Sequence, residues 1–208
     1  MSNLSDAKCR WCRKAGKKLF LKGEKCSSPK CTLNSRNTPP GVHGAKRPGK
    51  KSQYGQQLAE KQRAKKTYGM REKQFRLLFA KAGRQGDAGE HLLKMLETRL
   101  DNTIFRLGLA QSRPQARQMV SHGMFTINGK LVNIPSYQVK AGEIIGIKKN
   151  KRDKKLFVNL DEKMKKTETP SWLFFNKSEH EAKVLHAPTN DDIDKSINIQ
   201  AIVEFYSK

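Results

Sequence analysis

Residues 112–132 read SRPQARQMVSHGMFTINGKLV, and this stretch predicts a capped helix that leads directly into a β-hairpin. Ser112 is a residue type that caps helix N-termini, and Pro114 falls in the first turn, where its missing N–H is not needed. We predict the helix over 113–122, with Gly123 ending it. The pattern then changes from helical to alternating.

The predicted hairpin centres on Asn128-Gly129, a pair that readily adopts the positive φ angles of a two-residue turn. It joins two predicted strands, 125–127 and 130–132. A further strand is predicted at 143–147. A small antiparallel sheet therefore follows the helix.

Upstream of this stretch, apolar residues recur every three or four positions and predict one helix from about Glu90 to Leu107. Its apolar face consists of Leu93, Leu96, Leu100, Ile104 and Leu107. A basic helical pattern at 56–82 precedes it, and Tyr68-Gly69 is predicted to break that pattern into two helices.

The four cysteines of the chain, Cys9, Cys12, Cys26 and Cys31, follow the spacing C-x2-C-x13-C-x4-C. Two close pairs on a short connector can place four thiolates around one tetrahedral Zn²⁺. Because four sulfur ligands leave no position for water or substrate, we expect a structural zinc. An iron–sulfur cluster also accepts four thiolates and is the less favoured alternative.

The chain carries 43 Lys and Arg against 19 Asp and Glu, a net charge of +24. The excess is uneven: residues 1–70 carry +15, residues 71–155 carry +11 and residues 156–208 carry −2. A charge of this size on a folded chain favours a polyanionic partner along the first three quarters of the sequence. This composition indicates a nucleic-acid-binding protein.

No run of about 18 apolar residues occurs, so we expect no membrane span. Residues 1–6 lack the apolar core of a signal peptide. We therefore expect a cytoplasmic protein in a reducing compartment, where thiolates bind metal.

The predicted helix and hairpin offer one basic surface. Arg113 and Arg117 are four positions apart on one helix face, with Gln115 on a neighbouring face, and the hairpin can bring Lys130 beside them. For each arginine taken alone, a position on a solvated helix face without RNA contact is an equally good interpretation. No long recognition helix emerges, so the surface suits phosphates and folded RNA better than DNA bases.

Strings along nearly the whole chain resemble the small-subunit ribosomal protein four family, in its zinc-bearing bacterial form. Its RNA-binding domain is matched by Arg99-Leu100-Asp101-Asn102, Arg106-Leu107-Gly108, Ser112-Arg113, Gln115-Ala116-Arg117-Gln118, His122-Gly123 and Ile134-Pro135-Ser136-Tyr137. Its basic helices are matched by Tyr54-Gly55-Gln56-Gln57-Leu58, Tyr68-Gly69 and Glu72-Lys73-Gln74-Phe75. Its tail is matched by Pro170-Ser171-Trp172-Leu173 and Val203-Glu204-Phe205-Tyr206-Ser207. The match is weakest over 174–198.

The resemblance implies an α+β fold in three parts. These are a four-Cys zinc module at 1–44, a mostly helical basic domain at 45–91, and an inserted RNA-binding domain at 92–180. The inserted domain combines a helix-turn-helix and a β-hairpin with a small antiparallel sheet. Residues 181–208 are expected to pack back on the helical domain and complete it.

The resemblance further implies a structural constituent of the small ribosomal subunit. Such a protein binds the 5′ domain of the small-subunit ribosomal RNA, nucleates assembly of the subunit body and contributes to translational accuracy. Its expected partners are that RNA and neighbouring small-subunit proteins, especially the fifth, and mRNA where it enters the subunit is a further candidate. We expect neither a membrane nor a small-molecule substrate.

The residues expected to contact RNA are basic or polar and fall in two groups. The first group follows the cysteines and consists of Lys46, Arg47, Lys50, Lys51, Tyr54, Lys61, Arg63, Lys65, Lys66, Tyr68, Arg71, Lys73 and Arg76. The second group lies in the inserted domain and consists of Arg99, Arg106, Ser112, Arg113, Gln115, Arg117, His122 and Lys130.

Two other classes of function are weaker alternatives. The same RNA-binding domain occurs in RNA-modifying enzymes, but the chain has no Gly-rich phosphate loop and no nucleophile with a patterned base. We therefore do not expect an enzyme. A zinc-dependent regulator that binds nucleic acid is less favoured because no Cys/His finger recurs.

Overall fold

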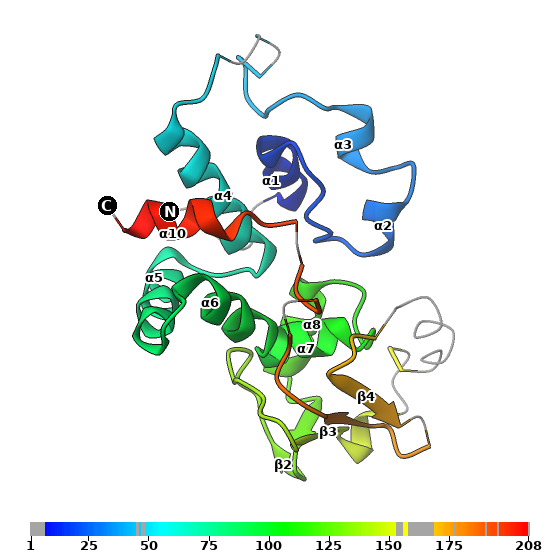
Figure 1. The fold of residues 1–208 in the computed structure, drawn as a ribbon. Coiled ribbons are helices and arrows are strands. Elements are labelled where there is room, and N and C mark those ends of the chain that lie inside the picture. Colours follow the sequence, from blue (N-terminus) through cyan, green and yellow to red (C-terminus); the bar gives the residue numbers. More distant parts are fainter. Residues whose placement is uncertain are drawn as a thin grey trace. The chain divides into compact units, whose positions relative to one another are not determined.

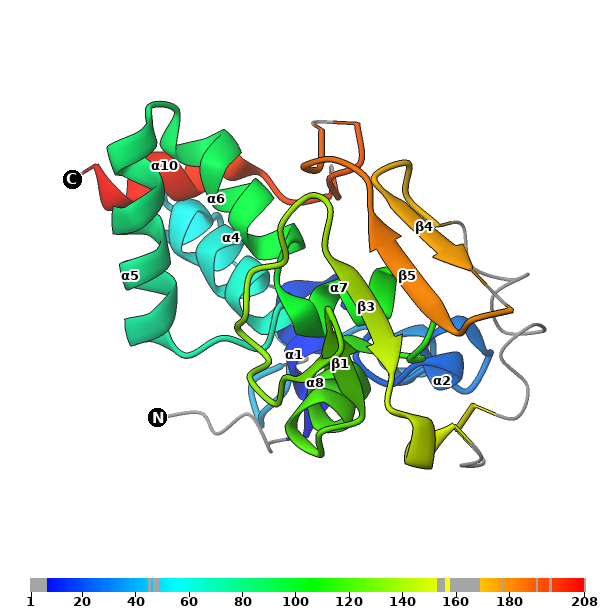
Figure 2. The same ribbon diagram turned by 90° about the horizontal axis from the view of Figure 1, so that it is seen from below.

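The computed structural model of the chain (Figure 1 and Figure 2) describes residues 7–44, 46, 49–152, 156–157, 169–176, 178–189, 191–194 and 196–207. The chain forms two compact units. The first comprises Met1–Leu92 with Asp194–Lys208, and the second comprises Leu93–Ile193. The first unit is helical and the second contains a small antiparallel sheet, so the expected α+β fold is confirmed at this level.

The boundaries of the units differ from those expected. The second unit runs to Ile193 rather than to residue 180, because strand β5 (Glu181–Val184) pairs with two other strands of the sheet. The segment that returns to the first unit therefore begins at Asp194. The cysteine region, 1–44, and the helical region, 45–91, lie in the same compact unit.

The cysteine region contains three short helices, α1 (Lys8–Ala15), α2 (Glu24–Ser27) and α3 (Thr32–Ser35). Its small core is formed by Cys12, Leu19 and Leu21, against which Trp11 packs. Arg13 on α1 makes an exposed hydrogen bond beside this core, from its Nε to the carbonyl oxygen of residue 38 at 2.8 Å. The loop after α3 is thereby tied to α1.

The rest of the first unit consists of α4 (Gln53–Thr67), α5 (Glu72–Ala82), the short 3-10 helix η1 (Gly83–Gln85), the start of α6 (Ala88–Glu97) and α10 (Ile199–Tyr206). Ser52 caps α4, since its Oγ accepts a hydrogen bond from the Gly55 N–H. Gly69 has a φ of +62°, which turns the chain sharply between α4 and α5. The predicted break at Tyr68-Gly69 is confirmed.

Helix α10 lies against α4, although the two are far apart in the sequence (Figure 1). Ile202 is fully buried there. The ring of Phe205 lies 5.6 Å from that of Tyr54, and the ring of Tyr206 stacks 4.6 Å from that of Phe79. The last helix thus supplies a buried aliphatic side chain and two half-buried aromatic rings to the packing of the first unit.

The second unit contains the end of α6, then α7 (Leu100–Arg106), α8 (Arg113–Ser121) and the 3-10 helix η2 (Lys149–Lys151). Ser112 caps α8 by accepting a hydrogen bond from the Gln115 N–H, and Gly123 follows the helix with a φ of +60°. The N-cap, the helix and its end agree with the prediction to within one residue.

The single helix predicted from Glu90 to Leu107 is wrong, because the chain forms α6 and α7 with a break at Thr98 and Arg99. Arg99 is extended and forms a β-bridge with Gln138. The Leu100 N–H donates to the carbonyl of residue 137 at 2.8 Å, and the N–H of residue 139 donates to the carbonyl of Thr98 at 2.9 Å. Hydrogen bonds to a distant segment replace those of a continuous helix.

The sheet has the strand order β2-β1-β3-β5-β4, and each neighbouring pair is antiparallel. Its strands are β1 (Phe125–Ile127), β2 (Lys130–Leu131), β3 (Ile144–Ile147), β4 (Leu173–Asn176) and β5 (Glu181–Val184). Asn128 and Gly129 have φ angles of +49° and +78°, the signature of the predicted hairpin turn. The hairpin and β3 are therefore confirmed.

Strands β4 and β5 are additions for which the sequence analysis has no prediction (Figure 2). The turn after them is held by Asp192, whose carboxylate accepts hydrogen bonds from the backbone and side chains of both Ser171 and Thr189. Burial alone would raise the pKa of Asp192, but these hydrogen bonds outweigh it and lower the pKa below its ordinary value.

The core of the second unit lies between helices α7 and α8 and one face of the sheet. Leu100 and Ile104 come from α7, Val120 from α8, and Phe125 and Ile145 from the sheet, and all five are buried. Alternate strand residues face this core, as the period of 2 requires.

Within the described part of the chain, no helix combines the length and the apolar character needed to cross a membrane.

We predict that Ile202→Ala loosens the first unit without affecting the second. Removing a fully buried branched side chain costs about 2–5 kcal/mol, and this side chain lies between α10 and α4. Hydrogen exchange should show faster exchange in α4 and unchanged exchange in β1 and β3. Gln200→Ala, at an exposed position of the same helix, is the control, and equal protection of α4 in both variants would contradict the prediction.

Candidate nucleic-acid interface

In the first unit, two lysines predicted to contact RNA share one carboxylate. The Nζ atoms of Lys61 and Lys65 each lie 2.6 Å from an oxygen of Glu72. Both lysines are buried, and Lys61 Nζ also sits 4.3 Å from the centre of the Phe205 ring, within reach of a cation–π contact. These two charges are used inside the unit, where they join α4, α5 and α10.

The cluster around Glu72 shifts the pKa values of two groups. Partial burial would raise the pKa of Glu72, but the hydrogen bonds and charges of Lys61 and Lys65 lower it below its ordinary value of 4.5. The Tyr206 hydroxyl donates a hydrogen bond to Glu72 Oε1 at 3.2 Å. Burial first, and then the neighbouring carboxylate, strongly raise the pKa of Tyr206, which therefore stays protonated.

Three further predicted RNA contacts, in α4 and directly after it, also pack within the first unit. Arg63 is buried, pairs with Glu60 at 3.1 Å and donates a hydrogen bond to the carbonyl of Ser196. Tyr68 is buried. Lys66 is half-buried, with its Nζ 4.1 Å from the centre of the Trp11 ring. The α4 residues thus hold the first unit together.

The exposed predicted contacts of the first unit lie before α4, in its first turn and around the start of α5. They are Lys46, Lys50, Lys51, Tyr54, Arg71, Lys73 and Arg76. Arg47, which was also expected to contact RNA, lies outside the described residues. The candidate surface of the first unit therefore consists of the basic loop before α4, the first turn of α4 and the exposed residues at the start of α5.

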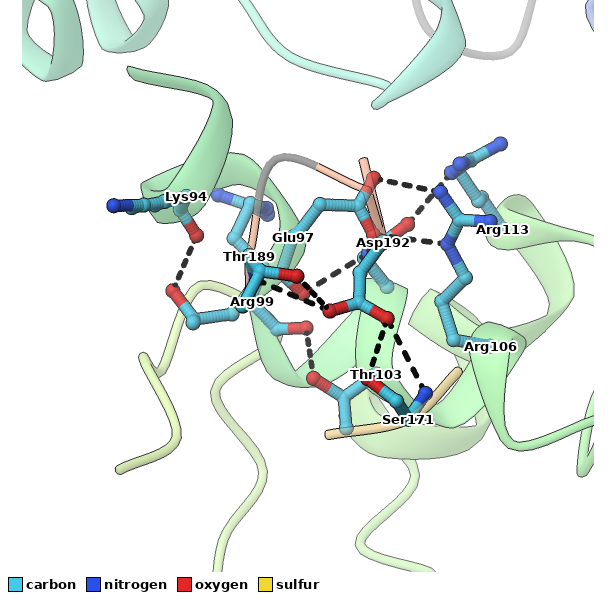
Figure 3. A network of polar contacts seen from close by, with 11 residues as sticks. Lys94, Glu97, Arg99, Thr103, Arg106, Arg113, Ser171, Thr189 and Asp192 are labelled. Atoms are coloured by element: carbon cyan, nitrogen blue, oxygen red, sulfur yellow. Dashed lines mark hydrogen bonds and ion pairs between the residues drawn. The ribbon is translucent and has the colours of Figure 1, made fainter. Parts of the chain in front are cut away.

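In the second unit, a fully buried carboxylate organises the end of α6. Glu97 accepts two hydrogen bonds from Arg106, at 2.9 and 3.0 Å, and one from the Asn102 amide at 2.8 Å (Figure 3). The Asn102 oxygen in turn accepts a hydrogen bond from Arg113 Nε at 2.7 Å. The Arg113 guanidinium also lies over the Phe105 ring, 4.7 Å from its centre. Helices α6, α7 and α8 are thus joined by one polar chain.

A second buried carboxylate, Asp101, holds the neighbouring arginines. Arg99 donates two hydrogen bonds to it, at 3.0 and 2.8 Å, and both side chains are about 6% exposed. Arg117 on α8 approaches the same carboxylate at 3.9 Å, and its side chain is 33% exposed. Asp101 therefore links a buried arginine to a surface arginine.

The structure divides the predicted RNA contacts by burial. The buried ones are Lys61, Arg63, Lys65, Tyr68, Arg99, Ser112 and Arg113. Their polar groups bind partners within the chain or sit in a helix cap. In the second unit, His122 and Lys130 are exposed, and Arg106, Gln115 and Arg117 are partly exposed.

The acidic residues that organise these cations are not among the predicted site residues, which are all basic, polar or cysteine. They are Glu60, Glu72, Glu97 and Asp101. A signal for Glu97 was present, since it stands four residues after Leu93 and three before Leu100, on the apolar face of the predicted helix. An acid on such a face needs a buried cationic partner.

The four cysteines are all reduced, and three of them, Cys12, Cys26 and Cys31, are buried. Burial raises the pKa of Cys12, as do the charges of the other three cysteines, while a hydrogen bond from the Leu19 backbone lowers it. In the described ranges, no three side chains among His, Cys, Asp and Glu are placed to hold a metal ion.

Comparison with known proteins gives two adjoining family matches. A family model described as "Ribosomal protein S4/S9 N-terminal domain" matches residues 3–97, and one described as "S4 domain" matches residues 98–145. The chain is 50% identical to "Small ribosomal subunit protein uS4A" of Alkaliphilus metalliredigens and 48% identical to "Small ribosomal subunit protein uS4" of Clostridioides difficile. Both similarities cover 100% of this chain and 100% of the relative.

We predict a pH-dependent loss of stability in Glu72→Gln. Glu72 has a lowered pKa in the folded state, so its contribution is present above the ordinary value of 4.5 and is lost as the pH falls through the lowered pKa. At about pH 7 the variant leaves Lys61 and Lys65 without their shared carboxylate, and we expect a loss of about 1–2 kcal/mol, reduced by the partial exposure of Glu72.

Thermal denaturation at several pH values checks this prediction. The difference between wild type and Glu72→Gln should shrink as the pH falls below 4.5. Lys73→Gln, at the next and exposed position of α5, should match wild type throughout. A difference between Glu72→Gln and wild type that stayed constant with pH would show that the carboxylate charge is not its source.

Proposed function

The chain belongs to the ribosomal protein S4 family, and we propose that it is a structural constituent of the small ribosomal subunit that binds ribosomal RNA. The observation that carries this conclusion is similarity over the full length of both chains, at 46–50% identity, to proteins named small ribosomal subunit protein uS4. The protein acts in the cytoplasm as part of the ribosome.

The charge of the chain supports this function. A net charge of +24 destabilises a compact chain by self-repulsion unless a polyanion offsets it. Cations at the surface of both units can each contact a phosphate. In the first unit these include the exposed Lys50, Arg71 and Arg76, and in the second unit the exposed Lys130 and the partly exposed Arg117. Phosphate contacts from two units suit a folded RNA better than a single strand.

The finer parts of the function follow from the family. The RNA site is the 5′ domain of the small-subunit ribosomal RNA, and binding there nucleates assembly of the subunit body. The protein neighbours the fifth small-subunit protein and contributes to translational accuracy, and mRNA where it enters the subunit is a further candidate partner. An RNA-modifying enzyme is disfavoured because the relatives that match from end to end carry names of ribosomal proteins.

The four cysteines support a structural zinc site as a second part of the proposal. Cys9, Cys12, Cys26 and Cys31 supply a four-sulfur donor set, and the Lys22 N–H donates a hydrogen bond to Cys26 Sγ at 3.3 Å. A bound Zn²⁺ would hold the short helices of this region together and offer no position for catalysis. An iron–sulfur cluster is the less favoured occupant of the same residues.

We predict a steep dependence of RNA affinity on salt. If six to ten phosphates are contacted, the affinity for a folded 5′-domain RNA should fall about 10³- to 10⁵-fold between about 50 and 200 mM salt. It should also exceed the affinity for an unstructured strand of equal length by about 4 kcal/mol or more at physiological salt. Filter binding or fluorescence anisotropy measures both quantities. A flat salt response or equal affinity for the two RNAs would contradict the proposed function.

We predict that purified protein contains about one equivalent of zinc and that Cys26→Ser loses it. Structural zinc contributes about 10–16 kcal/mol of apparent binding energy, more than the small core of this region can replace. Limited proteolysis should then cut the variant within residues 7–44 and spare the second unit. Ser27→Ala, an exposed neighbour, is the control. Elemental analysis that finds less than about half an equivalent of zinc per chain, and no iron in its place, would overturn the site.

A further inference from the structure

Each of two buried carboxylates in the second unit holds one inner and one outer arginine. Glu97 binds Arg106 directly and Arg113 through Asn102. Asp101 contacts both of its arginines, Arg99 and Arg117, directly. The inner arginines, Arg99 and Arg113, are at most 9% exposed. The outer pair, Arg106 and Arg117, have side chains that are 23% and 33% exposed.

We propose that Glu97 and Asp101 are positioning residues of the RNA-binding surface. Glu97 is linked through Asn102 to Arg113 and so joins α6, α7 and α8, whereas Asp101 fixes Arg99 at the start of α7. Each carboxylate also holds its outer arginine at the surface in an orientation suited to a phosphate. The inference rests on the proposed function, because it assigns roles within the same RNA-binding surface. It names Arg106 and Arg117 as the phosphate contacts and Arg99 and Arg113 as their support.

Burial and geometry explain the division of roles. The inner arginines make short hydrogen bonds of 2.7 to 3.0 Å, and Arg113 is further covered by the Phe105 ring. Of the outer pair, Arg106 also makes short hydrogen bonds, at 2.9 and 3.0 Å to Glu97, so its greater exposure of 23% is what separates it from the inner arginines. Arg117 is 3.9 Å from Asp101, a distance at which the carboxylate orients the guanidinium by charge rather than by a hydrogen bond. A phosphate can therefore approach Arg117 while the inner pair stays intact.

The two possible roles of Asp101, as a negative charge alone or as a positioning residue, predict opposite effects of Asp101→Asn on RNA affinity. Asp101→Asn keeps the size of the side chain but raises the net charge of the protein by one, which should strengthen binding to any RNA if the carboxylate acts only through its charge. If Asp101 positions Arg117, the same change should weaken binding to a folded RNA. The two readings thus differ in the sign of the effect.

The first experiment compares full-length wild type, Asp101→Asn and Glu179→Gln in binding to folded 5′-domain RNA and to poly(U) of equal length. Glu179 is exposed in the second unit, so its variant adds the same charge at the surface. We expect Asp101→Asn to bind the folded RNA about tenfold more weakly, which corresponds to one hydrogen bond to a charged group. Glu179→Gln should bind both RNAs as tightly as wild type or more tightly.

The outcomes separate failure of the inference from failure of the proposed function. Wild type that binds both RNAs equally would overturn the proposed function. Wild type that prefers the folded RNA, with Asp101→Asn binding it as tightly as Glu179→Gln does, would overturn the inference alone. Circular dichroism establishes that each variant is folded before binding is measured.

A second pair of variants tests the proposal if Asp101→Asn does not fold. Arg117→Gln should keep the thermal stability of wild type and reduce the slope of log affinity against log salt by about 1, the value for one lost phosphate contact. Arg113→Gln should lower the thermal stability and, at a temperature where it is folded, leave the slope unchanged. An equal loss of slope in both variants would overturn the division into inner and outer arginines.

Discussion

The second unit depends on keeping one carboxylate charged where no solvent reaches it. Glu97 is fully buried at the end of α6, and a bare carboxylate there would cost several kcal/mol. Arg106 and Asn102 supply three hydrogen bonds that offset this cost, and Asn102 carries the link on to Arg113. Because all these partners come from α7 and α8, the charge of Glu97 is satisfied only when the three helices have their native arrangement. The carboxylate therefore specifies how the helices pack.

Pairing of an acid with cations inside a unit recurs along this chain, in which cations far outnumber anions. Glu72 gathers two lysines, Glu60 pairs with Arg63, and Asp101 pairs with Arg99. Each of these acids neutralises cations that lie inside a unit, where repulsion would be strongest. The cations left at the surface carry the excess charge that a polyanionic RNA can offset. A few acids that pair with buried cations thus allow a strongly basic chain to fold before it meets its partner.

Local signals predicted the parts of the fold that are formed by neighbouring residues. The cap at Ser112, the turn at Asn128-Gly129 and the break at Gly69 depend on backbone angles that these residue types favour by themselves. The break between α6 and α7 could not be found in this way. Its cause is hydrogen bonding to residues 135–139, which lie some forty positions further along the chain.

The sequence by itself determined the fold class, the family and the basic character of the partner surface, because these depend on periodicity, on matched strings and on summed charge. Only the tertiary structure decided which cations are buried and which reach the solvent. Arg113 and Arg117 stand on one helix face and look equivalent in sequence, yet Arg113 is 9% exposed and hydrogen-bonded to Asn102, whereas Arg117 reaches the solvent. The physical reason is that the free energy of a charge depends on its burial and its partners. Both are set by residues such as Glu97 and Asp101, which only the folded chain brings beside the arginines.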